Sequence, residues 1–166
     1  MDTKLIDETF DLLERHMDSE SAVHLSRALP YVDQLASLLR ESGLTRDRQM
    51  TILGCFILLQ HSLGRHAEAA DKLNEGAKLA RTILDGDYLL GAYMALMSSR
   101  AEMRLFKHLM PVYKRIQLAR LAGRPFARLT NELYAAFQAY IDADHRHASP
   151  VASWIARGKD REEKRS

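Results

Sequence analysis

Seven histidines are the residues of this chain best suited to metal binding or acid–base chemistry. His61 and His66 stand five apart across an expected turn, and His145 and His147 flank Arg146 near an expected helix end. Metal ligands must converge on one point, and neither spacing is a dependable ligand pattern. The remaining histidines are scattered, at His16, His24 and His108. We therefore expect no metal site.

Nucleophilic residues do not form a catalytic pattern either. Ser98 and Ser99 stand beside Arg100 and Glu102, but no G-x-S-x-G turn, adjacent base or oxyanion glycine accompanies them. Cys55 lies inside an apolar run, where a small buried side chain is the ordinary role of cysteine. We expect no catalytic residue, no cofactor and no enzymatic activity; an enzyme with an unrecognised site is the alternative from a different class.

Length and composition indicate one soluble domain. A chain of 166 residues can bury roughly 70% of the surface that its unfolded form exposes, so it needs no covalent staple. One cysteine excludes an intrachain disulfide, which favours a reducing compartment. The first residues are acidic and amphipathic, and no apolar run approaches the roughly 18 residues of a membrane span. These features predict a cytoplasmic protein without a membrane partner.

Charge is unevenly spread although the formal net charge is only +2. Residues 1–20 are rich in acids, whereas residues 100–128 hold a single acid, Glu102, among many bases. Clustered cations can bind phosphates, so a nucleic-acid-associated regulator is one alternative function. Because no helix-turn-helix pattern or set of stacking aromatics accompanies them, we favour a solvated face or contact with the acidic first helix. The basic face would contain Arg104, Lys107, Lys114 and Arg115.

Apolar residues recur at intervals of three and four, and nothing alternates with period two for long. Leu29, Val32, Leu35, Leu38 and Leu39 show the helical interval. Pauses at glycine, proline and polar clusters then divide the chain. The expected helices, about seven, are 4–16, 21–41, 47–63, 66–84, 87–102, 105–122 and 126–143.

Two prolines leave helix boundaries open. Inside a helix a proline removes a hydrogen bond and clashes with the preceding turn, at about 3 kcal/mol. Pro30 and Pro111 therefore either kink their helices or stand at their beginnings.

The stretch "LGRHAEAADKLNEGAKLA", from Leu63 to Ala80, resembles the second half of a tetratricopeptide repeat. Gly64 stands at the turn, His66 at the usually aromatic position, Ala69 and Gly76 at the small crossing positions, and Leu73 at the large apolar one. Residues 47–63 would form the first helix of this hairpin. In the following unit Met103, His108 and Arg115 replace the turn glycine and the two small residues, and the spacing is longer than usual.

This resemblance implies a right-handed stack of antiparallel helical hairpins, a tetratricopeptide-like solenoid. Residues 1–46 would be an N-terminal helical cap, 47–144 the hairpins, and 145–166 a C-terminal segment with a charged, disordered tail that Trp154 and Ile155 pin to the body. A homodimer is a further arrangement, because a short stack leaves the sides of its terminal hairpins uncovered.

In the tetratricopeptide family the first helix of each hairpin lines a concave surface. The resemblance therefore implies a protein–protein interaction module, acting as an adaptor, chaperone or regulator, that holds a peptide or helical segment of another protein. A regulatory sensor for a small ligand or signalling peptide is the alternative use of the same groove. The expected partner-binding residues are Leu58, His61, Ser62, Leu90, Tyr93, Met97, Arg100, Asn131 and Tyr134.

Overall fold

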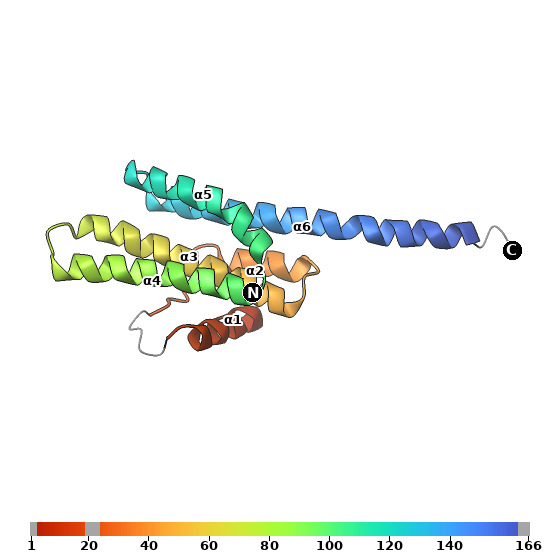
Figure 1. Ribbon diagram of the computed structural model, residues 1–166, viewed down its shortest axis with the longest axis horizontal. Coiled ribbons are helices and arrows are strands. Elements are labelled where there is room, and N and C mark those ends of the chain that lie inside the picture. The colour runs from red at the N-terminus through yellow and green to blue at the C-terminus, as the bar shows by residue number, and fades with distance from the viewer. Residues whose placement is uncertain (1–2, 19–23, 163–166) are drawn as a thin grey trace.

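Helices are the only regular elements in the part of the chain that the structure describes. The computed structural model describes residues 3–18 and 24–162, with side chains up to residue 144. Its helices are α1 (Thr3–His16), α2 (Val32–Glu41), α3 (Arg46–Asp71), α4 (Ala77–Ser99), α5 (Met103–Leu121) and α6 (Phe126–Glu162) (Figure 1). The all-α prediction is confirmed for this part of the chain.

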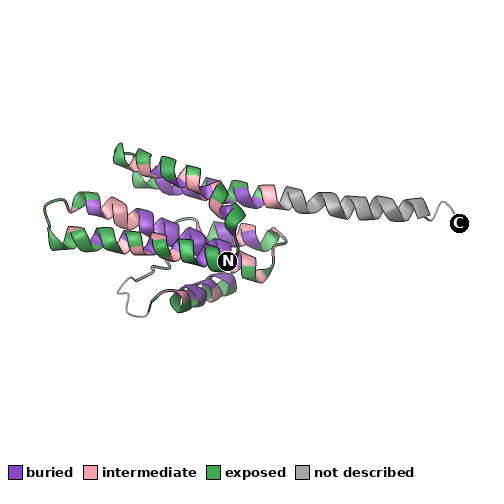
Figure 2. Ribbon diagram, in the orientation of Figure 1, coloured by how far each residue is buried: buried purple, intermediate pink, exposed green. Residues whose placement is uncertain are grey.

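Helix α3 lies at the centre, with α1, α2, α4 and α6 packed around it (Figure 1). Every residue from Thr51 to Gln60 is buried, whereas a helix covered on one side buries only every third or fourth residue. Figure 2 shows this concentration of buried residues on α3. Among the polar members, Thr51 donates to the Asp47 carbonyl at 2.8 Å and the Gln60 amide nitrogen to the Pro30 carbonyl at 3.2 Å, whereas Gln60 Oε1 has no hydrogen-bond partner among the described residues.

Two antiparallel hairpins make up most of the molecule, one of α3 and α4 and the other of α5 and α6 (Figure 1). Each turn contains a glycine with positive φ, Gly76 at 44° and Gly123 at 77°. Helix α6 continues beyond the bundle to Glu162 (Figure 1).

The expected helix breaks at 63–65 and 84–87 are wrong, and residues 3–18 and 24–162 form six helices, so the expected seven are not confirmed. Gly64 lies inside α3 and Gly86 inside α4, so the hairpin turn falls at 72–76 instead. Of the two, Gly86 is required by close packing: a Cβ there would overlap the His66 ring, whereas one on Gly64 would stand 3.6 Å from the Phe126 ring, an ordinary contact. The stacked-hairpin arrangement is therefore not confirmed, because Gly64 does not turn the chain.

Pro30 and Pro111 occupy different positions relative to their helices. Pro30 precedes α2, whose N-cap Tyr31 has a φ of 65°, so residues 24–31 do not belong to the helix expected over 21–41. Pro111 lies inside α5 on an exposed side of the helix. The expected helix end at 143 is also wrong, since the backbone stays helical to Glu162. The side chains of Trp154 and Ile155 and the end of the expected tail lie outside the described residues.

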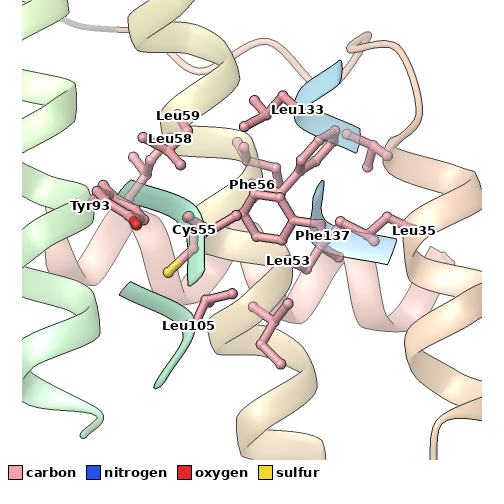
Figure 3. Packing of buried hydrophobic residues seen from close by; sticks show 14 of the residues in the cluster. Leu35, Leu53, Cys55, Phe56, Leu58, Leu59, Tyr93, Leu105, Leu133 and Phe137 are labelled. Carbon is pink, nitrogen blue, oxygen red and sulfur yellow. The ribbon is translucent and has the colours of Figure 1, made fainter. Parts of the chain in front are cut away.

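Aromatic rings join α3 to α6 in the core. Phe56 meets Phe137 edge to face with ring centroids 5.2 Å apart (Figure 3). Beside this pair, Tyr134 of α6 stacks on Tyr31, which precedes α2, with ring centroids 4.8 Å apart. Such pairs add about 0.5–1.5 kcal/mol to the free energy gained by burying their area. Cys55 is fully buried in the same layer, and this desolvation raises the pKa of its thiol far above the ordinary value.

Helices α3 and α4 pack tightly where the His66 ring lies over Gly86. The Gly86 carbonyl also accepts a hydrogen bond of 2.8 Å from the fully buried Ser62 hydroxyl. Any Cβ at residue 86 would require the imidazole to move. Gly91, one and a half turns later in α4, has open space around the same position.

These two glycines provide a matched pair of substitutions. We expect Gly86→Ala to lower the free energy of unfolding by about 1–3 kcal/mol through overpacking. Gly91→Ala should raise it by about 0.5–1 kcal/mol, because alanine is the better helix former. Urea unfolding measures both, and His66→Ala should remove most of the Gly86→Ala cost. Equal effects at the two positions would contradict the close approach.

Candidate functional site

The expected partner-binding residues do not form one accessible surface. Leu58, Ser62, Tyr93 and Met97 are buried in the core, and Leu58 and Tyr93 appear there in Figure 3. A residue without exposed surface has nothing to offer a partner in this structure.

The other members of that set are dispersed. Half-buried His61 meets the backbone of Ser26, and Tyr134 is engaged with Tyr31 and Phe56. Arg100 forms an ion pair with Asp47. Leu90 is half-buried on α4, and Asn131 is exposed on α6.

A polar bridge, composed of Ser62, His66, Tyr113, Gln117 and Arg120, joins the two hairpins. The Tyr113 hydroxyl lies 3.3 Å from that of Ser62 and accepts a hydrogen bond of 2.8 Å from Gln117. Arg120 donates to Gln117 at 2.8 Å and to the His66 carbonyl at 3.1 Å. The spacings 62–66 and 113–117–120 place each helix's members on one face, a pattern that sequence inspection could have found.

Serine, histidine and aspartate meet at this bridge, but their geometry does not suit nucleophilic catalysis. His66 Nε2 lies 3.4 Å from the Asp87 carboxylate and makes no hydrogen bond with any described residue. The Ser62 hydroxyl, in contrast, is fully buried and donates a hydrogen bond to the Gly86 carbonyl. A hydroxyl without access to solvent cannot meet a substrate, so the bridge connects helices.

A second set of polar contacts gathers at the beginning of α3. Arg46 pairs with Glu8 of α1 at 2.6 Å, and Asp47 pairs with Arg100. Arg48 pairs with Glu102, before α5, and with Asp144 of α6 at 3.0 Å. We call residues 46–48 with these partners the α3 clasp. Three consecutive residues thus tie the central helix to α1, to the connection between α4 and α5, and to α6.

Arg48 is the centre of the α3 clasp. The hydrogen bond from Arg48 to Glu102 is the main reason that the pKa of the guanidinium is raised above its ordinary value. The Tyr140 hydroxyl donates to Glu102 at 3.3 Å, and burial raises the pKa of Tyr140 to about 12. Both carboxylates are well covered, with side-chain exposures of 8% for Glu102 and 11% for Asp144; Glu102 depends on Arg48 for its ionic partner, and Asp144 has Arg48 at 3.0 Å and Arg104 at 3.5 Å.

The expected contact between the basic segment and the acidic first helix is not formed among the described residues. Asp7 of α1 pairs with Arg27, and Glu8 pairs with Arg46. Within the expected basic face, Arg104 reaches Asp144 at 3.5 Å and Arg115 reaches Glu132 at 2.7 Å. Lys107 and Lys114 form no ion pair with any residue whose side chain is described.

These two lysines belong to an exposed line of residues along α5. Spacings of three and four place its members within an arc of about 80° at 100° per residue. Met103, Leu118 and Leu121 are exposed to 47%, 58% and 72%, which is high for large apolar side chains. We call this line the α5 stripe; it consists of Met103, Lys107, Pro111, Lys114, Leu118 and Leu121.

The described part of the chain contains neither a candidate metal-binding cluster nor a candidate membrane-spanning helix. Across residues 3–18 and 24–144, histidine, cysteine and carboxylate side chains nowhere gather in a group of three that could hold an ion. His145 and His147 lie outside the described side chains. None of the helices searched within the described chain has the length and apolar character that a membrane span requires.

Comparisons with known proteins add no relative: no family model, curated protein or solved structure matches the chain.

Removing the centre of the α3 clasp should destabilise the fold. We expect Arg48→Met to lower the free energy of unfolding by about 2–3 kcal/mol, because Glu102 loses its ionic partner and Asp144 keeps only the longer contact with Arg104. This figure is below that for a fully buried pair, since the Arg48 side chain is 32% exposed. Denaturant unfolding measures it, with the exposed Arg81→Met as control. Equal stability of the two variants would contradict the role assigned to Arg48.

His61 gives the stability a pH dependence. Burial lowers its pKa below 6.5 in the folded state, so the unfolded chain takes up the proton first as the pH falls. The free energy of unfolding should therefore decrease from about pH 6.5 down to the folded pKa and carry the full penalty below it. His61→Gln should reduce this dependence, whereas the exposed His24→Gln should leave it unchanged. A steeper decrease in His61→Gln would contradict the assigned shift.

Proposed function

We propose that this chain is a helical interaction module that binds a segment of another protein along the α5 stripe. The observation that carries this proposal is the exposure of Met103, Leu118 and Leu121 on one line of one helix. Leu118 and Leu121 lie one turn apart, and exposed apolar side chains that lie together mark binding surfaces in soluble proteins more often than isolated ones do. Met103 extends the line by about 22 Å along the helix axis. The buried residues of the originally expected groove do not contribute to this surface.

The shape of the stripe supports a helical or extended partner segment. Helix α5 has 19 residues, so the stripe runs along about 27 Å of one helix. An amphipathic helix lying beside α5 would cover it with residues spaced at three and four. The opposite side of α5 is occupied inside the protein, where Leu105, Leu109, Tyr113 and Ile116 are buried.

The module acts by binding rather than by catalysis. Its only serine, histidine and aspartate grouping, within the described residues, has a Ser62 hydroxyl that is fully buried. A small-ligand sensor has less support, because the residues expected to line its groove pack against one another in the core. The proposed role is that of an adaptor, chaperone or regulator.

A photo-reactive amino acid in place of Leu121 tests the interaction in the cells of origin. We expect ultraviolet light to yield a covalent adduct with one other protein, of defined mass, because Leu121 would lie inside the interface. Leu73 is exposed to a similar extent, 71%, but lies in the turn between α3 and α4, so the same substitution there is the matched control. Identical adducts from both positions, or none from Leu121, would overturn the proposal.

A further inference from the structure

The charge of α5 is one-sided. Its sequence from Met103 to Leu121 contains five lysines and arginines and no acid. Arg104 and Arg115 are engaged with carboxylates of α6, and Arg120 with Gln117 and the His66 carbonyl. Lys107 and Lys114 are the α5 cations with neither an ion pair nor a side-chain hydrogen bond among the described residues, and they are the two members of the α5 stripe that carry charge.

We infer that the partner segment is an acidic amphipathic helix whose carboxylates meet Lys107 and Lys114 while its apolar residues cover Leu118 and Leu121. This inference rests on the proposed function and specifies the chemistry of the partner. Lys107 and Lys114 are seven residues apart, so their positions on the helix are separated by about 10 Å. A partner helix would present two carboxylates two turns apart, with apolar residues one turn further on.

The order of residues along the stripe argues against a lipid surface as the occupant. Helices that lie on membranes keep their cations on the face opposite the apolar residues. In the α5 stripe the lysines stand within the same arc as Met103, Leu118 and Leu121. Burying the leucines in acyl chains would draw the ammonium groups toward hydrocarbon, whereas a protein partner can place a carboxylate opposite each lysine.

A nucleic acid, or a second copy of the chain docking through α1, would contact the lysines of the α5 stripe but not its leucines. Phosphates would pair with the lysines but leave Leu118 and Leu121 uncovered. The acidic side of α1 presents Asp7, Asp11 and Glu14, and all the exposed residues of α1 are polar or charged. A second copy docking through α1 would therefore meet the lysines without covering the leucines.

A synthetic peptide is the direct test of this inference. The probe is a fluorescent helix of about 18 residues, long enough to span about 27 Å, with leucines on one face and glutamates beside them. Its matched controls are the same peptide with every glutamate changed to lysine, and a scrambled peptide of equal composition. Fluorescence anisotropy with the full chain should show binding of the acidic amphipathic peptide and not of the controls.

Variants of the chain then separate charge from apolar contact. Lys107→Glu with Lys114→Glu should weaken peptide binding at least about fivefold, because each attraction becomes a repulsion. Leu118→Ala with Leu121→Ala should weaken it to a similar extent with less dependence on salt. Arg40→Glu with Arg81→Glu changes the net charge equally at exposed positions of other helices and should leave binding unchanged.

Raising the salt from about 0.1 M to about 1 M, which shortens the Debye length from about 10 Å to about 3 Å, should weaken binding to the unsubstituted chain.

Other outcomes would overturn the inference. Equal binding of the scrambled peptide, or tighter binding of duplex DNA, would indicate a general cation surface. Binding of phosphatidylserine vesicles without peptide binding would indicate a lipid surface, and a dimer that Lys107→Glu and Lys114→Glu dissociate would indicate a second copy. If Leu121 forms its protein adduct in cells but the acidic peptide does not bind, the proposed function stands and the partner chemistry is wrong; if both fail, both are wrong.

Discussion

The burial of α3 on all sides is the constraint on which the rest of this structure depends. Ten consecutive buried residues, Thr51 to Gln60, require covering helices in every direction, and α1, α2, α4 and α6 supply them. Polar side chains inside this helix must find partners within the protein, as Gln60 does at the Pro30 carbonyl. Helix α5 packs mainly against α6 and not around α3, which explains why one side of it, with Leu118 and Leu121, stays exposed.

Sequence periodicity predicted the helical class correctly but placed several helix ends wrongly, and the glycines show why. The sequence predicts Gly64 and Gly86 as turn residues, whereas Gly86 leaves space for the His66 ring and Gly64 lies inside α3, where a Cβ would be in ordinary contact with the Phe126 ring. A glycine that accommodates a neighbour and a glycine that turns the chain look alike in sequence, because only the tertiary contact distinguishes them. Gly76, which does turn the chain with a positive φ, was interpreted as a crossing residue.

The candidate site was harder to predict than the fold. Leu58, Tyr93 and Met97 were assigned to a groove by analogy with a repeat family, and burial in the core explains their apolar character instead. Lys107 and Lys114 were identified from charge alone, since a run of bases without acids is visible in sequence. What sequence could not show is which bases find carboxylates: Arg115 meets Glu132 through the packing of α5 on α6.

Cys55 adds a consequence for how the molecule responds to its surroundings. Its thiol is fully enclosed and its desolvation disfavours the reactive thiolate. Oxidants and alkylating reagents can therefore reach it only when the helices around α3 separate. Because it is the chain's single thiol, its rate of alkylation would measure how often these helices separate.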